Sequence, residues 1–158
     1  MRRFKQLVSE DETRSILCGA TSGVLSLTNA DGSPYGVPLS FAYDGVNSIY
    51  FHSAVSGQKI DCIAQDSRCS FCVIAQDSIV PEEFTTYFRS VIVSGTISVV
   101  EDCDEVMKGL LLLCEKYSPG IDSSSEIKKC INHVKILRLD IDGMTGKESI
   151  ELVRKQKM

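Results

Sequence analysis

The sequence predicts a mainly β protein in which an antiparallel sheet forms a small barrel and helices serve as peripheral connectors. Apolar and polar residues alternate in several segments, most clearly over 85–101. There, Val91, Val93 and Ile97 share one face of a strand, and a more polar set shares the other. Gly95, in the middle of this segment, predicts a bend or bulge of the kind that a barrel corner needs. Short turn signals between the segments favour antiparallel neighbours.

Six strands are expected. Asp31-Gly32 and Asp44-Gly45 are hairpin signals between alternating segments, and they predict that the first three strands form a meander. The expected strands cover 23–29, 37–45, 48–54, 69–76, 85–101 and 133–144.

Four helices are expected as connectors. Ser9 can cap the first, over 9–18, because Glu12 follows three residues later as in a capping box. A short helix is expected over 57–65. Asp102 or Asp104 caps a third helix that ends near Tyr117, and a fourth covers about 125–132, while the basic tail 151–158 is expected to be exposed.

The 158 residues are 43% hydrophobic and 24% charged, the profile of a globular protein with one domain spanning 1–158. The formal net charge of −4 argues against a general nucleic-acid binder, which would rely on a basic surface. No apolar run approaches the roughly 18 residues that a membrane-spanning helix needs. The start, Met1-Arg2-Arg3-Phe4, is not followed by the apolar stretch of a signal peptide, so a cytoplasmic location is expected.

The seven cysteines are irregularly spaced, which fits reduced cytosolic thiols. Cys69 and Cys72 have C-x-x-C spacing, but they lie in an expected strand, where residues three apart point to opposite faces. The two histidines, His52 and His133, are far apart in sequence, and no second cysteine pair suits zinc. The sequence therefore predicts structural cysteines and no metal site.

The segment IYFHSAVSGQKIDCI, residues 49–63, changes from a strand pattern to a helix pattern. A helix N-terminus offers free backbone N–H groups and the positive end of the helix dipole. Gly57 permits close backbone approach, and Lys59 adds a charge suited to phosphate. Ser53 and Ser56 add hydroxyl donors. These residue types predict a site for a phosphorylated cofactor.

A structural explanation of the same segment stays open beside this one. Glycine-containing loops with a solvated lysine are common. His52 also fits a strand histidine that hydrogen-bonds a neighbour.

Five segments, taken in order, resemble a known family. They are MRRF, SILCGATSGVLSLTNADGSPYGVPLSFAYDG, IYFHSAVSGQKIDCI, YFRSVIVSGTISVVED and LRLDIDGMTGKES. The chain resembles the FMN-binding split-barrel family related to pyridoxamine 5′-phosphate oxidase, and within it the branch of 5-nitroimidazole-resistance (Nim-type) proteins. The resemblance covers most of the chain. It implies a six-stranded antiparallel split β-barrel of the FMN-binding type, and a homodimer with FMN in the cleft between the barrels. A small barrel has a limited interior, which agrees with a cofactor at an interface.

The resemblance also implies roles for particular residues. Lys59, with Ser53 as a helper, would hold the FMN phosphate in a stretch of the form H-x-A-x-x-G-x-K that includes Gly57. His52 and Ala54 would lie near the ring or the ribityl chain. The remaining implied contacts are Pro38, Leu39, Ser40 and Phe41 along the isoalloxazine ring, and Tyr87, Ser90 and Val91 as the other wall.

Two classes of function follow. The first is an FMN-dependent oxidoreductase that reduces nitro-aromatic compounds, such as 5-nitroimidazoles, or other small acceptors, with His52 as a polar group or proton donor near the small-molecule substrate. The second is a carrier or sensor of flavin or haem without turnover, in which a single histidine could ligate haem iron. A third alternative is an empty barrel whose dimer interface does other work.

The chain departs from true pyridoxamine phosphate oxidases. It has no tryptophan, the region after Ser78 is short and acidic, and it has no convincing counterpart of their substrate-binding arginine and histidine pair. Activity as the vitamin B6 oxidase is therefore not expected. The closing Thr145-Gly146-Lys147 motif is expected to be a structural turn.

Overall fold

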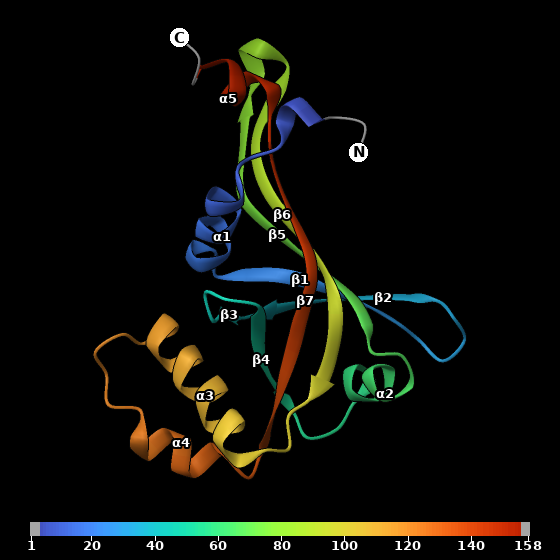
Figure 1. Cartoon of the computed structure of the whole chain (residues 1–158), viewed down its shortest axis with the longest axis vertical. Coiled ribbons are helices and arrows are strands. Elements are labelled where there is room, and N and C mark those ends of the chain that lie inside the picture. The colour runs from blue at the N-terminus through green and yellow to red at the C-terminus, as the bar shows by residue number, and fades with distance from the viewer. Residues whose placement is uncertain (1–3, 156–158) are drawn as a thin grey trace.

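A seven-stranded antiparallel sheet forms the body of the computed structural model, which describes residues 4–155 (Figure 1). Neighbouring strands follow the order β2-β1-β5-β6-β7-β4-β3. The mainly β class with peripheral helices is confirmed. The strands are β1 (Ser22–Thr28), β2 (Pro34–Ser40), β3 (Ala42–Tyr43), β4 (Ser48–Ala54), β5 (Arg68–Val80), β6 (Thr85–Val99) and β7 (Val134–Glu148). The helices are η1 (Phe4–Gln6), α1 (Glu10–Gly19), α2 (Gln58–Gln65), η2 (Pro81–Glu83), α3 (Cys103–Tyr117), α4 (Ser124–Cys130) and α5 (Ile150–Lys155).

The strand expected over 37–45 is broken, and this break is why the sheet has seven strands where six were expected. Phe41 separates β2 from β3, and these two strands lie at opposite edges of the sheet. The hairpins expected at Asp31-Gly32 and Asp44-Gly45 are confirmed as β1–β2 and β3–β4. The expected meander is wrong, because the chain crosses from one edge of the sheet to the other between β2 and β3.

The last strand is longer than expected. β7 continues to Glu148, so the Thr145-Gly146-Lys147 segment pairs with β6 and the turn expected there is wrong. A Cβ on Gly146 would collide with the side chains of Val8 and Thr13, which pack against β7. Gly146 therefore allows the N-terminal segment to approach β7 closely, and it does not form a turn.

The four expected helices are confirmed, and two of their caps follow the sequence signals. The Ser9 side chain accepts a hydrogen bond from the Glu12 N–H, and the Asp102 side chain accepts one from the Glu105 N–H. The tail does not simply extend into solvent, because residues 151–153 are half-buried in α5, which lies beside η1 (Figure 1). The expectations for residues 1–3 and 156–158 lie outside the described residues. In the described part of the chain, no helix is long and apolar enough to cross a membrane.

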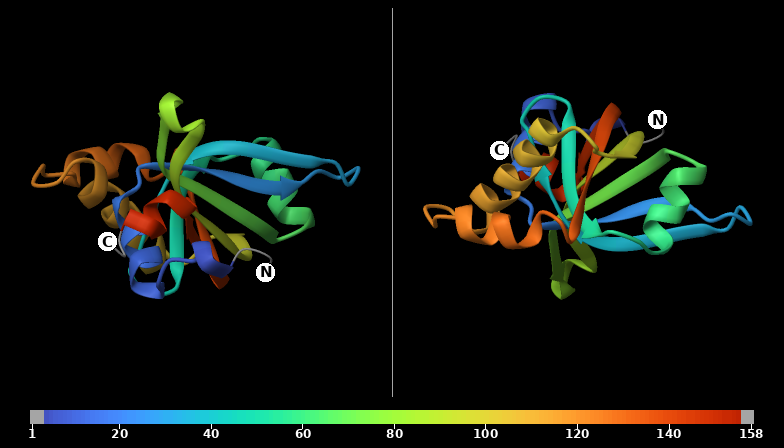
Figure 2. Two further views of the ribbon diagram at one scale, coloured as in Figure 1. Left: turned by 90° about the horizontal axis from the view of Figure 1, so that it is seen from above. Right: turned by 90° about the horizontal axis from the view of Figure 1, so that it is seen from below.

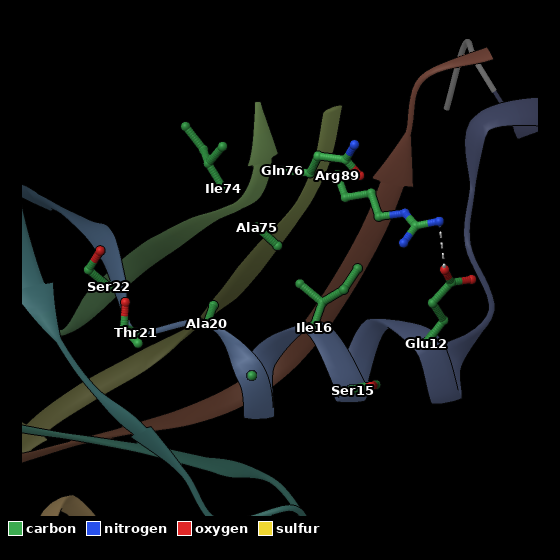
Figure 3. Close-up of a pocket in the computed structure, with 11 residues that line it drawn as sticks. Glu12, Ser15, Ile16, Ala20, Thr21, Ser22, Ile74, Ala75, Gln76 and Arg89 are labelled. Atoms are coloured by element: carbon green, nitrogen blue, oxygen red, sulfur yellow. Dashed lines mark ion pairs between the residues drawn. The ribbon is translucent and has the colours of Figure 1, made fainter. Parts of the chain in front are cut away.

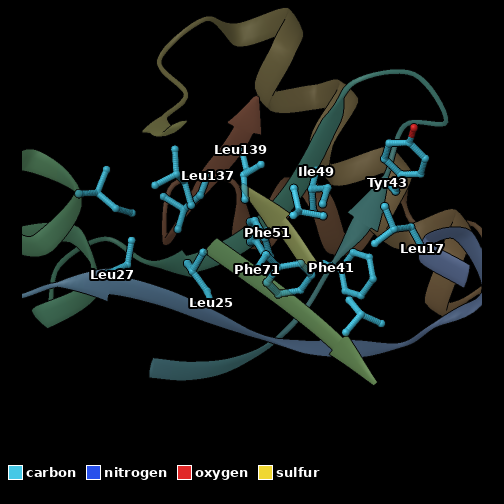
Figure 4. Packing of buried hydrophobic residues seen from close by; sticks show 14 of the residues in the cluster. Leu17, Leu25, Leu27, Phe41, Tyr43, Ile49, Phe51, Phe71, Leu137 and Leu139 are labelled. Carbon is cyan, nitrogen blue, oxygen red and sulfur yellow. The ribbon is translucent and has the colours of Figure 1, made fainter. Parts of the chain in front are cut away.

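Three phenylalanines fill the interior of the curled sheet (Figure 4). Phe71 meets Phe41 and Phe51 edge to face, with ring centroids 4.9 and 5.1 Å apart. All three side chains are fully buried, and edge-to-face contacts of this kind add to the hydrophobic stabilisation. The Phe41 side chain therefore packs into the interior at the break between β2 and β3.

A second apolar cluster lies between α3 and the side of β4 and β7 that faces away from the barrel interior. Gly109 of α3 is the point of closest approach, since a Cβ there would lie 2.7 Å from Ile136 and 3.0 Å from Tyr50. The helix therefore packs tightly on β4, the strand that leads into the predicted phosphate segment. Figure 2 shows the α3–α4 pair and α2 on opposite sides of the sheet.

β6 bends at Gly95, as its sequence predicts. The register with β7 shifts between Ser94 and Gly95. A Cβ on Gly95 would overlap the Asp140 carbonyl oxygen of β7 and lie 3.0 Å from the Leu139 side chain. The alternation expected over 85–101 is confirmed in β6, where the apolar set faces inward and the polar set is exposed.

Gly95→Ala is expected to lower the free energy of unfolding by at least about 2 kcal/mol, because the new methyl group must displace a strand backbone. Gly19→Ala is the control, since Gly19 ends α1 and no heavy atom would lie within 4 Å of its Cβ. The control is expected to change the free energy by less than about 1 kcal/mol. Urea unfolding followed by circular dichroism measures both, and equal effects would contradict the tight contact at Gly95.

Candidate functional site

The predicted phosphate segment forms the loop and first helical turn that follow β4. β4 ends at Ala54, and α2 begins at Gln58 after a loop that contains Gly57. Gly57 has a φ of 130°, a backbone conformation that favours glycine, and it makes no side-chain cap for α2. Lys59 is half-buried in the first turn, and Asp61 is exposed in the same turn. The structure therefore brings Gly57 and Lys59 together at an uncapped helix start, where one carboxylate partly offsets the positive charge.

The predicted residues of β4 point in opposite directions. His52 and Ala54 are exposed, whereas Ser53 is only 6% exposed. Because successive strand residues alternate in direction, the Ser53 hydroxyl points toward the barrel interior. His52 shares the outer side of β4 with Tyr50, which α3 covers. Of these three residues, His52 and Ala54 present their side chains outside the barrel.

The predicted residues of β2 alternate in the same way. Pro38 and Ser40 are exposed, while Leu39 and Phe41 pack into the interior cluster. β2 approaches β4 in space although the two strands are not paired in the sheet. We call this approach the seam. Its exposed predicted residues are Pro38 and Ser40 on β2, and His52 and Ala54 on β4.

Tyr87, Ser90 and Val91 of β6 lie far from the β4 side of the seam within one chain. Ser90 pairs with Lys147 of β7, whereas His52 pairs with Ile136 of the same strand. At about 3.3 Å per residue, these two positions along β7 are on the order of 30 Å apart. The side chains of Tyr87 and Val91 are also buried. One chain therefore does not bring His52 and Ser90 together, and it buries two of the three side chains predicted for the second wall.

An apolar row crosses the outer side of the sheet. Directly paired residues on adjacent strands point to the same side. The register aligns Pro38, Val24, Cys72 and Ile92 in such a row across β2, β1, β5 and β6. Val24 is 41% exposed and Ile92 is 51% exposed. We call this row and its neighbour the outer face, and the neighbouring row consists of Gly36, Ser26, Ser70, Ser94 and Gly143.

A cavity of about 490 Å³ opens between α1 and strands β5 and β6 (Figure 3). Ser22 and Ile74 form part of its lining. The register pairs Ser22 with Ser40, and Ile74 with Ser90. Two residues that the sequence assigns to the cofactor site are therefore direct neighbours of the cavity wall.

Arg89 is a cavity residue that sequence reasoning did not select. Its Nε donates to Glu148 at 3.2 Å, and its guanidinium lies 4.0 Å from the Glu12 carboxylate, as Figure 3 shows. Because two carboxylates accompany this one arginine, the cavity suits neutral polar groups better than a phosphate. One sequence feature could have identified it: Arg89 is the single charged residue in β6, and it lies between the predicted site residues Tyr87 and Ser90.

All seven cysteines are free thiols. The Cys69 thiol points to the Gly95 carbonyl oxygen at 3.5 Å, whereas Cys72 lies on the outer face. Burial raises the pKa of Cys69 to about 12, so this residue stays a thiol at neutral pH. Within residues 4–155, no three His, Cys, Asp or Glu side chains converge as ligands for a metal ion.

A cluster of charges joins α3 to β4, β7 and the β3–β4 turn. The Tyr50 hydroxyl donates to the Glu105 carboxylate, and this hydrogen bond lowers the pKa of Glu105. Lys108 lies 3.6 Å from Asp44 and 3.7 Å from Glu105, and Arg138 lies 3.6 Å from Glu105. Each charge in this cluster has an opposite charge beside it, which indicates that the cluster anchors α3 and is not a ligand site.

Solved structures of similar shape define the class of fold. A proposed 5-nitroimidazole antibiotic resistance protein from Bacteroides thetaiotaomicron matches with a TM-score of 0.78 and 24% identity, over 90% of this chain and 86% of that one. A conserved hypothetical protein from Mycobacterium tuberculosis matches with a TM-score of 0.82 and 19% identity, over 100% and 93%. A FAD and heme binding protein from Mycobacterium smegmatis matches with a TM-score of 0.74 and 22% identity, over 92% and 74%. These matches show that the chain has the split-barrel fold that its sequence implies.

The comparison with family models goes further than the fold. The model described as pyridoxamine 5′-phosphate oxidase matches residues 9–148. The chain belongs to this family, and the family resemblance seen in five sequence segments is confirmed. No curated protein matches the chain in sequence.

Proposed function

We propose that this protein binds FMN and acts as an FMN-dependent oxidoreductase on small acceptors. The observation that carries the proposal is the glycine-opened start of α2, with Lys59 in its first turn, directly after the exposed end of β4. Uncapped N–H groups, the helix dipole and a lysine together suit a phosphate monoester. Ser53, whose hydroxyl is buried, would help through its backbone. The similar M. smegmatis protein is described as binding FAD and heme, which supports a flavin here.

The seam fits the rest of the cofactor. Pro38, Ser40, His52 and Ala54 present small or polar side chains outside the barrel, so a flat ring can come close to both strands. Phe41 would contribute through its backbone, since its side chain is buried. When bound, the flavin would supply the electron transfer, and the chain would hold it, orient it and exclude water.

The proposal includes a homodimer with FMN at the subunit interface. The outer face has an apolar row beside a row of small residues, and such a surface lets a second copy approach closely. Pro38 belongs both to this face and to the seam. A cofactor beside Pro38 would therefore also touch a second chain on the outer face. On β6 of that chain, the half-buried Ser90 and the backbone of Tyr87 and Val91 would form the second wall.

His52 is the proposed polar group beside the substrate, because it is exposed on the outer side of β4. An imidazole carries an N–H that can donate a proton to a bound acceptor. Nitro-aromatic compounds are the proposed class of acceptor, on the similarity to the B. thetaiotaomicron protein.

A flavin or haem carrier is the second candidate, because the exposed His52 could ligate iron and the M. smegmatis protein is described as binding heme. We expect the purified protein, mixed with FMN and desalted, to keep an absorption band near about 450 nm that NAD(P)H bleaches. A stable band without bleaching by any reductant would favour the carrier, and a band near about 400 nm would favour haem. A colourless protein that does not retain FMN would remove the proposal.

Lys59→Ala is expected to raise the dissociation constant for FMN about 10- to 150-fold, which corresponds to the loss of roughly 1.5–3 kcal/mol from one phosphate ion pair and its hydrogen bonds. Lys129→Ala is the matched control, because this lysine pairs with Glu126 on α4 at 3.5 Å, away from α2. Quenching of flavin fluorescence measures both constants. Equal affinity in wild type and Lys59→Ala would exclude the α2 start as the phosphate site.

Ile92→Glu is expected to turn the dimer into a monomer and to weaken FMN binding, because a buried unpaired carboxylate at the interface is costly. Ile121→Glu is the matched control, since Ile121 is 70% exposed in the α3–α4 connection, away from the outer face. Sedimentation velocity with and without FMN measures the assembly. An Ile92→Glu protein that stays dimeric and binds FMN like wild type would contradict the proposed interface.

A further inference from the structure

Tyr117, the last residue of α3, joins three segments beside the seam. Its hydroxyl accepts a hydrogen bond from the Phe41 N–H at 2.9 Å. The same oxygen lies 2.9 Å from the Phe41 carbonyl oxygen and 2.5 Å from the Thr21 carbonyl oxygen. A hydroxyl has one proton to donate, and Thr21 is the nearer acceptor. One side chain therefore holds the crossing between β2 and β3 and the residue that precedes β1.

The backbone of Phe41 needs such a partner. Phe41 lies between β2 and β3, outside the pairings that join either strand to its neighbour. A buried backbone N–H or carbonyl group without a partner costs free energy comparable to a lost hydrogen bond. Tyr117 supplies from α3 the hydrogen bond that a neighbouring strand supplies elsewhere in the sheet.

Lys116, the neighbour of Tyr117 in α3, contacts the ring of Phe41. Its Nζ lies 3.9 Å from the centroid of the Phe41 ring. This nitrogen is buried and has no hydrogen-bond partner among the described residues, and burial lowers the pKa of Lys116. A cation–π contact with the ring is the compensation that the geometry offers. The last turn of α3 thus contacts Phe41 at both its backbone and its ring.

The Tyr117 hydroxyl contacts backbone groups at both parts of the candidate site, the seam and the cavity. Ser40 ends β2, the strand that would border the flavin ring, and Phe41 follows it. Thr21 lines the cavity of Figure 3. Ser22, the residue after Thr21, pairs directly with Ser40. A shift of either backbone segment would therefore change the shape of the seam and of the cavity wall together.

We propose that Tyr117 is a positioning residue of the cofactor site. It fixes the Phe41 and Thr21 backbones so that the end of β2 and the start of β1 keep the spacing that the flavin ring needs. This inference rests on the proposed function, because it concerns the same FMN site. Tyr117 acts through these backbone groups, and loss of its hydroxyl leaves them to water and loosens the seam.

Tyr117→Phe, which removes only the hydroxyl, tests the inference in the full-length protein. We expect an approximately tenfold higher dissociation constant for FMN and an altered visible circular dichroism spectrum of the bound flavin. Tyr43→Phe is the matched control, since the Tyr43 hydroxyl accepts from Arg14 at 2.5 Å and donates to the Val46 carbonyl at 2.9 Å. The control is expected to lower thermal stability while the FMN dissociation constant stays within about twofold of wild type.

Amide hydrogen exchange gives a second readout that does not depend on a well-folded variant. Coupling between two sites is reciprocal, so bound FMN is expected to slow exchange of the Phe41 amide in the wild-type protein. The Val46 amide, which donates to the Asp44 side chain at 2.9 Å in the β3–β4 turn, is expected not to change. No FMN-dependent change at Phe41 would overturn the inference even if Tyr117→Phe failed to fold.

The outcomes separate this inference from the proposed function. If Tyr117→Phe binds FMN as tightly as wild type while its Phe41 amide exchanges faster, the hydroxyl is structural only, and the FMN proposal stands. If the wild-type protein itself does not bind FMN, both proposals fail. Tenfold weaker binding in Tyr117→Phe, with near wild-type binding in Tyr43→Phe, supports the positioning role.

Discussion

The crossing of the chain at Phe41 is the constraint on which the rest of the structure depends. β2 and β3 are separated by this one residue, yet they occupy opposite edges of a seven-stranded sheet. Since each residue extends the chain by at most about 3.6 Å, the two edges must come within about 7 Å of each other at this point. The sheet therefore has to curl, and the curl creates both the interior that Phe51 and Phe71 fill and the seam outside it. The α3 contacts to Phe41 hold this arrangement in place.

Charge is distributed unevenly around the seam, and this distribution orients the proposed ligand. Lys59 stands at the uncapped start of α2, whereas Arg89, at the cavity, is accompanied by Glu12 and Glu148. An anionic phosphate would be drawn to the first position and not to the second. A flavin with its phosphate at α2 would run along the exposed residues of β2 and β4, so its ring would come to lie away from α2. Both charge and shape thus favour the same orientation of the proposed cofactor, with its phosphate at α2 and its ring away from α2.

Sequence patterns predicted local structure well where residues close together in the sequence determine it. The alternation in β6, the caps at Ser9 and Asp102 and the bulge at Gly95 depend on neighbours in sequence or on a residue type with one physical meaning. The break at Phe41 could not be predicted locally, because the partner of its backbone, the hydroxyl of Tyr117, lies 76 residues further along the chain. The Thr145-Gly146-Lys147 segment resembles a turn in sequence. Its glycine is instead required by close contacts with Val8 and Thr13, which no local pattern encodes. Arg89 was passed over for the same reason, since its carboxylate partners come from α1 and β7.

The position of the core explains why the candidate site is incomplete in one chain. The curled sheet is small, and aromatic and aliphatic side chains from nearly every strand pack its interior, so the proposed cofactor would bind on the outside. A site on the outer side of a sheet is open to water unless something covers it. Within one chain, α3 covers β4 only as far as Tyr50 and Ile136, and His52 and Ala54 remain exposed beyond it. The uncovered apolar row that begins at Pro38 borders this opening. In the proposed dimer, a second copy on that row would bury apolar surface and close the site in one step, so dimer stability and affinity for the cofactor would rise and fall together.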